Sequence, residues 1–166
     1  MTDKDVHIEK LRDYAIKHSK MGYYSIHGIS HWDRVARNAD ALSTSDVDSL
    51  VVKAFAYIHD VERINEGDDW QHGPRAALFV DEIRSSVLSF LNDLEIEQLK
   101  EACRLHTLRH KTEDTTVNAC FDADRLDLGR VGITPNPDKM ATETGRLLAE
   151  KLALNDSEED LLLNGG

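Results

Sequence analysis

His59 and Asp60 stand side by side in the stretch AYIHDVER, directly after residues of the kind that fill a protein core. Burying an ionisable side chain without a partner is costly in free energy, so the doublet needs a local explanation. A metal ion, a salt bridge or exposure at the surface would each supply one. Because a chain of this length with eight histidines and 19 aspartates is expected to contain about one such dipeptide by chance, its meaning depends on other polar residues.

Three further polar side chains lie on or beside apolar helical stripes. His31 is at a predicted helix start, His106 continues one apolar stripe, and Asp124 continues another. Taken singly, His106 is explained as a hydrogen-bonded core histidine and Asp124 as the ion-pair partner of Arg125. Taken together with the His-Asp doublet, they form an imidazole and carboxylate set suited to a divalent transition metal.

Helices must bring these side chains together, because apolar residues recur at spacings of three and four and no period of two is convincing. The predicted helices cover about residues 4–19, 31–42, 45–61, 74–87, 94–108, 116–129 and 137–154. Ser45 and Asp48 resemble a capping box, and Pro74 suits a first helical turn. Residues 155–166 are expected to form a short helix or to fray. The predicted fold class is an all-α helical bundle in a single domain, 1–166.

Composition narrows the functional classes. A length of 166 residues with 40% hydrophobic content suits one domain with a real core. The N-terminus is charged and no apolar run reaches the length of a membrane span, so we expect a cytoplasmic protein without membrane contact. A formal net charge of −11 argues against binding of nucleic acid polymers. Cys103 and Cys120 lack CxxC spacing and are expected to be buried thiols.

An ordered series of motifs connects these residues. HGISHWDRV is followed by HD, then HGPRAA, then a histidine on a later helix, then DADRLDLGRVGI. In this order they resemble the HD-domain metal-dependent phosphohydrolases, particularly small uncharacterised bacterial members. The resemblance covers about residues 24–135 and implies that the helix at about 137–154 packs on this core.

The resemblance implies a site, residue by residue. It assigns four ligands of one divalent metal ion (Mn, Ni, Co, Fe, Zn or Mg), namely His31, His59, Asp60 and Asp124. Some family members use two more histidines for a second metal ion or for phosphate, and His72 and His106 stand in those positions. His72 is explained equally well as a loop cap next to Pro74.

The sequence departs from better-studied branches of the family at one catalytic position. A glutamate often follows the aspartate of the doublet by three residues, but here that position is Arg63. Glu62 is offset by one residue, which turns it about 100° away on a helix. Asp60, with one oxygen on the metal, is the predicted group to orient water, and Glu62 is a reserve candidate for proton transfer.

Several side chains near these motifs are candidates for binding substrate. Guanidinium groups form paired hydrogen bonds with phosphate, which favours Arg34, Arg63 and Arg75. Each is also explained as a solvated arginine or a surface salt bridge. His27, four residues before His31, is either a substrate or supporting contact or an ordinary loop residue.

The predicted function is hydrolysis of a phosphoester or phosphoanhydride in a small phosphorylated metabolite, with a nucleotide as the expected class, by metal-activated water. One alternative is a metal-binding regulatory module without turnover, which the missing glutamate favours. Another is a di-iron oxygenase-like HD protein, which requires both His72 and His106 as ligands. The sequence leaves the substrate, the metal and the oligomeric state open.

Overall fold

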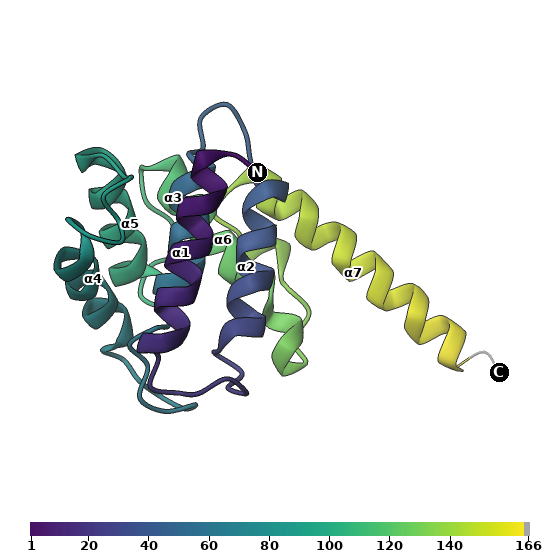
Figure 1. The fold of residues 1–166 in the computed structure, drawn as a ribbon. Helices are drawn as coiled ribbons and strands as arrows, with labels where there is room; N and C mark the ends of the chain where they lie inside the picture. The colour runs from purple at the N-terminus through teal and green to yellow at the C-terminus, as the bar shows by residue number, and fades with distance from the viewer. Residues whose placement is uncertain (165–166) are drawn as a thin grey trace.

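Helices account for the regular structure of residues 1–164, the part of the chain that the computed structural model describes (Figure 1). In chain order they are α1 (Asp3–His18), α2 (Ile29–Ala41), α3 (Ser49–Ile58), α4 (His72–Ile83), α5 (Asp93–Leu105), α6 (Thr115–Arg125), the 3-10 helices η1 (Leu128–Val131) and η2 (Pro137–Lys139), and α7 (Glu143–Asn164). No strand occurs within these residues, so the predicted all-α class is confirmed.

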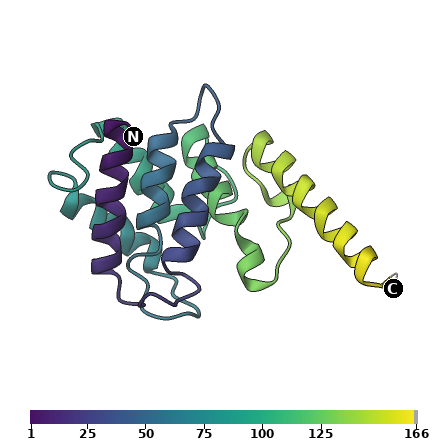
Figure 2. The same cartoon turned by 45° about the vertical axis from the view of Figure 1, so that its right-hand side comes forward.

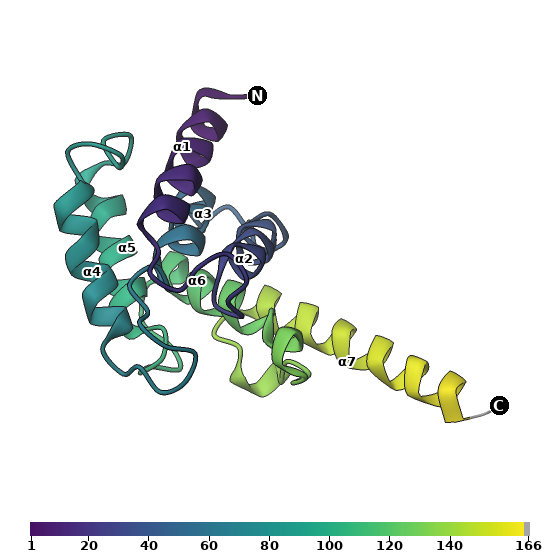
Figure 3. The same cartoon turned by 60° about the horizontal axis from the view of Figure 1, so that its bottom comes forward.

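The helix α3 lies in the middle of the bundle, and α1, α2, α5 and α6 pack around it (Figure 3). Its sequence, SLVVKAFAYI, is apolar on nearly every side, and a helix of that kind is stable when neighbours cover it all round. Val51, Phe55 and Ile58 have no solvent exposure. Because α3 is central, the two residues that follow it, His59 and Asp60, lie deep in the molecule.

A polar contact between three helices holds the start of α2 in place. The Arg12 guanidinium on α1 donates to both oxygens of Asp33 on α2, at 2.8 and 2.9 Å. The Tyr57 hydroxyl on α3 donates to the same carboxylate at 3.0 Å. These bonds fix the first turns of α2, which carry His31, against the central helix.

The start of α3 differs from the prediction. Asp48 is the N-cap residue, since its side chain accepts a hydrogen bond from the Leu50 N–H at 3.0 Å, and the predicted capping box with Ser45 is wrong. The Thr116 hydroxyl of α6 accepts a hydrogen bond from the Asp48 N–H at 2.9 Å. This contact from a distant helix places the cap three residues later than the local pattern indicated.

The C-terminal helix also differs from the prediction. Asn136 caps only the short helix η2, and α7 begins at Glu143 because Asp122 accepts the N–H groups of Ala141 and Thr142 just before it. The helix continues to Asn164, so residues 155–164 extend α7 instead of forming a separate short helix or a frayed end, and residues 165–166 lie outside the described residues.

The α7 helix packs on the bundle through its first half and then extends away from it (Figures 1 and 2). Ala149 is fully buried, whereas Leu161, Leu162 and Leu163 are largely exposed. The Thr134 hydroxyl donates to Asp156 at 2.6 Å and ties the middle of α7 to the loop before it. Within residues 1–164, the helices lack the combination of length and apolar character needed to cross a membrane.

Candidate metal centre

Six side chains from five neighbouring helices converge inside the bundle. They are His31 on α2, His59 and Asp60 at the end of α3, His72 at the start of α4, His106 at the end of α5, and Asp124 on α6. Asp124 is 20% exposed at its side chain and the others are buried. Because His59 and His106 are C-cap residues, the negative ends of two helix dipoles lie beside this group and favour a cation.

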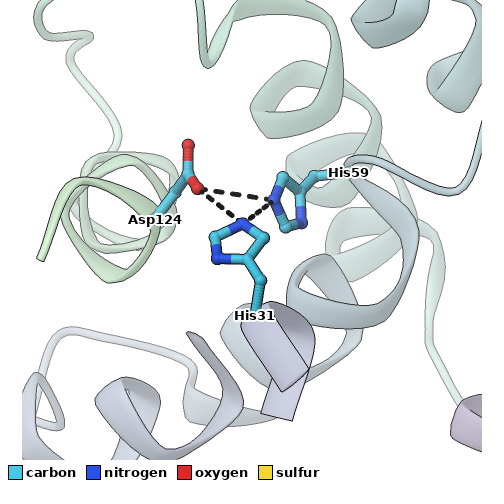
Figure 4. A group of neighbouring side chains, drawn as sticks. All are labelled: His31, His59 and Asp124. Carbon is cyan, nitrogen blue, oxygen red and sulfur yellow. Dashed lines mark hydrogen bonds and ion pairs between the residues drawn. The ribbon is translucent and has the colours of Figure 1, made fainter. Parts of the chain in front are cut away.

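The first half of the group consists of His31, His59 and Asp124 (Figure 4). The Nε2 atoms of the two histidines are 3.1 Å apart. The Asp124 Oδ1 atom lies 3.1 Å from the Nε2 of His31 and 3.5 Å from that of His59. Figure 4 shows the three atoms facing a common point from three separate helices.

Asp60 connects this half to a second one. Its Oδ2 atom lies 3.4 Å from the Nε2 of His59 and 3.7 Å from that of His31. Its Oδ1 atom faces the other way and lies 3.1 Å from the Nε2 of His72 and 3.8 Å from that of His106. The Nε2 atoms of His72 and His106 are 3.0 Å apart. Asp60 therefore belongs to both halves of the group. Its Oδ2 atom faces His31 and His59, and its Oδ1 atom faces His72 and His106.

The opposite nitrogen of each imidazole shows which ring atom carries the proton. Every Nδ1 faces an oxygen that has no hydrogen to give, so Nδ1 must donate. The acceptors are Asp127 Oδ2 for His31 (2.7 Å), the Phe55 carbonyl for His59 (3.0 Å), the Asp69 carbonyl for His72 (2.5 Å) and the Cys103 carbonyl for His106 (2.7 Å). All four Nε2 atoms therefore present lone pairs to the interior of the site, as metal-binding histidines do.

The imidazole lone pairs and the carboxylate oxygens are all electron-rich, so they repel one another at these distances. A cation bound between them turns this repulsion into attraction. Asp124 Oδ1 is buried and has no hydrogen-bond partner, a state that is costly unless an ion binds it. Ligand atoms bound at about 2.1 Å in tetrahedral or octahedral geometry lie about 3.0–3.4 Å apart. The distances of 3.0–3.8 Å within the two halves are close to that spacing. The residues present fit a metal ion.

The electrostatics of the site also favour positive charge. Burial opposes ionisation of Asp60, but the adjacent histidines, His59 first, outweigh it and hold the pKa of Asp60 well below its usual range. The same balance, through His31 and His59, lowers the pKa of Asp124. Burial also opposes charge on His59, yet the two carboxylates outweigh it and raise its pKa to about 10, so without an ion this ring carries on Nε2 the proton that a bound cation would displace. Burial lowers the pKa of His106, which keeps that ring neutral and able to bind a metal.

Three of the predicted substrate contacts lie at this centre. The His27 Nδ1 is 3.2 Å from Asp60 Oδ2, and the Arg63 Nε is 3.4 Å from Asp60 Oδ1. The Arg34 Nε donates to Asp127 at 2.7 Å, and its side chain is 39% exposed. A solvent-borne anion can therefore reach the Arg34 guanidinium beside the candidate metal ligands.

Glu62 and Arg75 make their contacts outside the group of six side chains, and their predicted roles in proton transfer and substrate binding stay predictions. The Glu62 carboxylate is bound by His18, the last residue of α1, at 2.7 Å and by Lys20, in the loop that follows, at 3.4 Å. The one-residue offset from the family position turns it away from the ligands. Arg75 is engaged in the structure, donating to the Glu62 carbonyl at 2.9 Å and to the Asp69 carboxylate at 2.6 Å.

Two aspartates that support the histidines were missed or only partly assigned from the sequence. The position of Asp127, one turn beyond Asp124, favours a residue that orients a ligand or pairs with Arg130. Its carboxylate accepts the His31 Nδ1–H at 2.7 Å, and the Arg130 Nη1 donates to its carbonyl at 2.9 Å. Asp69 was not identified at all. Its position three residues before His72 was the available signal, but its carbonyl, rather than its side chain, holds that ring.

Comparisons with known proteins show a related fold. No family model and no curated protein match the sequence. A crystal structure from an uncultured Thermotogales bacterium, named a predicted HD superfamily hydrolase, has a TM-score of 0.69 and 24% sequence identity to this chain. The match covers 98% of this chain and 92% of that one. This likeness confirms the architecture that the motifs predicted, and the chain has the fold of the HD-domain proteins.

Proposed function

We propose that this protein is a metal-dependent hydrolase that cleaves a phosphoric ester or anhydride bond in a small phosphorylated metabolite. The observation that carries the proposal is the convergence of four imidazole Nε2 atoms on the carboxylates of Asp60 and Asp124. The name of the Thermotogales protein with the same fold supports hydrolysis. A nucleotide is the substrate class that the motif resemblance favours.

Two metal ions fit the centre. His31, His59, Asp60 through Oδ2 and Asp124 would hold one ion, and His72, His106 and Asp60 through Oδ1 would hold the other. Bound ions supply Lewis acidity, which lowers the pKa of water and offsets the negative charge of phosphate. Both Asp60 oxygens face histidines, so we assign Asp60 to ligation rather than to the orientation of water.

The chain supplies the remaining functions around the ligands. Arg34 is held by Asp127 at one nitrogen and exposed to solvent, which suits it to bind a phosphate oxygen of the substrate. His27 and Arg63 are each 11% exposed and contact opposite oxygens of Asp60. They limit access of water to the ligands and present donors at the edge of the site.

A screen of phosphorylated metabolites tests this function. Protein stripped with a chelator is incubated with each substrate and with Mn²⁺, Ni²⁺, Co²⁺, Fe²⁺, Zn²⁺ or Mg²⁺, and released phosphate is measured beside the metal content. We expect release that needs an added ion and that Asp124→Asn abolishes. Bound metal without release from any substrate would favour the regulatory module instead.

Oxygen activation is the second candidate, because both His72 and His106 lie at the centre as a six-ligand di-iron site requires. Loading with Fe²⁺ in the absence of air, followed by exposure to oxygen, separates the two. Oxygen consumption with two irons per chain, and no phosphate release, would replace the hydrolase proposal.

The net charge of the protein bears on which partners it can bind. We propose a cytoplasmic location and a small-molecule substrate, without nucleic acid polymers or membranes as partners. A net charge of −11 disfavours contact with extended anionic surfaces, whereas a small phosphate needs only the local arginines.

A further inference from the structure

The helices α4 and α5 are in close contact at Gly73, the residue after His72. A Cβ atom built at Gly73 would lie 2.6 Å from the Cys103 carbonyl oxygen, 3.4 Å from the Arg104 carbonyl oxygen and 3.5 Å from His106 Cε1. The closest of these atoms belongs to the backbone of α5, so it cannot move aside alone as a flexible side chain would.

The Cys103 carbonyl, which lies against Gly73, also accepts a hydrogen bond from His106. It is one of the last carbonyls of α5, which have no partner within the helix, and it accepts the His106 Nδ1–H at 2.7 Å. The hydrogen-bond acceptor that orients His106 is therefore the same atom on which Gly73 packs. The spacing of α4 from α5 and the orientation of the His106 ring are coupled through one oxygen.

We propose that Gly73 is a positioning residue for the second metal ion, an inference that rests on the two-ion centre of the proposed function. Its missing side chain lets His72 and His106 come within 3.0 Å of each other, where both face Asp60 Oδ1. Any larger residue separates α4 from α5 and displaces the Cys103 carbonyl, so the second ion is lost.

The first ion should survive this change. Three of its four ligands, His31, His59 and Asp124, lie on or next to α2, α3 and α6 rather than at the contact of Gly73 with α5. The fourth, Asp60, would bind it through Oδ2, whereas its Oδ1 faces His72 and His106. Gly73 is also outside the left-handed region of the backbone, where only Gly22 and Gly132 lie among the residues described. The backbone conformation at position 73 therefore suits alanine, and the effect of its methyl group comes from the contact with α5 alone.

Manganese stoichiometry in the full chain tests the inference. Metal-free protein is loaded with Mn²⁺, dialysed and assayed for ions per chain, and the electron paramagnetic resonance signal of a coupled Mn²⁺ pair is recorded. We expect two ions and a coupled signal in the wild type, one ion and no coupled signal in Gly73→Ala, and one ion in His72→Ala. Gly129→Ala is the matched control, since nothing lies within 4 Å of a Cβ built there, and it should bind two ions.

The outcomes separate the two claims. Two coupled ions in both the wild type and Gly73→Ala overturn the role of Gly73 and leave the metal centre standing. A wild type that binds fewer than two ions overturns the two-ion centre, and the role of Gly73 with it.

A second variant applies if circular dichroism shows Gly73→Ala to be unfolded. Arg75→Met removes the bond from Arg75 to Asp69, whose carbonyl holds His72, and adds no atom at the helix contact. It should weaken binding of the second Mn²⁺ about tenfold, as loss of a group that supports a ligand typically does. Wild-type affinity for the second ion in this variant overturns the inference that the first turn of α4 positions it.

Discussion

Asp127 illustrates how a side chain that binds no metal in the proposed centre can still determine metal affinity. It accepts the His31 Nδ1–H at 2.7 Å and thereby directs the other ring nitrogen at Asp60 and Asp124. Burial opposes its ionisation, but His31 and Arg34 outweigh that effect and lower its pKa, so it stays a charged acceptor.

We expect Asp127→Ala to lower the affinity for the first ion about 10- to 100-fold, because the His31 ring loses the acceptor that fixes its orientation. Isothermal titration with Mn²⁺ measures this change. Arg34→Ala is the control, since it removes the other partner of Asp127 and should spare metal affinity while weakening hydrolysis. Unchanged affinity in Asp127→Ala would show that packing alone orients His31.

The sequence identified the side chains of the centre better than it identified their supports. The structure brings the predicted ligands together. They could be predicted because each lies in a motif and the motifs follow one another in an informative order. Asp69 was missed because its backbone carbonyl makes the contact, and any residue type has one. The partners of Glu62 could not be predicted, because His18 at the end of α1 and Lys20 in the loop after it come from a segment that the local pattern could not position.

At the scale of elements, α5 should depend on its buried face and tolerate change on its exposed one. Leu99 is fully buried, whereas Leu94, in the first turn, is 67% exposed. Leu99→Ala should lower the free energy of unfolding by about 2–5 kcal/mol through lost burial and the cavity that remains. Leu94→Ala on the same helix should change it by less than about 0.5 kcal/mol. Urea denaturation of the metal-free variants gives both values, and equal losses would contradict this assignment of the faces.

The thiols of α5 and α6 should be inert in the folded protein. Cys103 and Cys120 have no solvent exposure, and burial raises the pKa of both thiols. They remain protonated through the neutral and mildly alkaline range, and only the thiolate is nucleophilic. A colorimetric disulfide reagent at pH 8 should detect no thiol in the native chain and two after unfolding in guanidinium chloride. Rapid reaction of one native thiol would mean that α5 and α6 separate readily.

Helix periodicity predicted which segments are helical but not where they end. The apolar stripes of α3 and α5 recur at the spacing of a buried helix, which a local pattern can show. Their boundaries depend on side chains from elsewhere, such as Thr116 beside the Asp48 cap and Asp122 beside the start of α7. A sequence window around the boundary does not contain these partners.

At the scale of the whole molecule, the candidate centre joins five helices, α2 to α6, whose ligands span the chain from His31 to Asp124. The N-terminal helix packs on α3 from outside, and α7 extends beyond the bundle (Figure 1). The ordered motifs predicted this convergence, whereas the direction of α7 depends on contacts of its first turns that no motif specifies.

Metal binding should therefore stabilise the entire bundle. An ion that binds the folded chain and not the unfolded one adds about 2.7 kcal/mol at a free concentration 100 times its dissociation constant. We expect the free energy of unfolding, measured by urea denaturation, to rise by about that amount or more when Mn²⁺ is restored to chelator-treated protein. Asp60→Asn should show no such gain, because Asp60 serves both halves of the centre, and Asp13→Asn, on the exposed face of α1, should respond like the wild type. An equal gain in all three proteins would place the ion outside this centre. The binding of a metal ion elsewhere would not depend on the Asp60 carboxylate, which lies between the two histidine pairs.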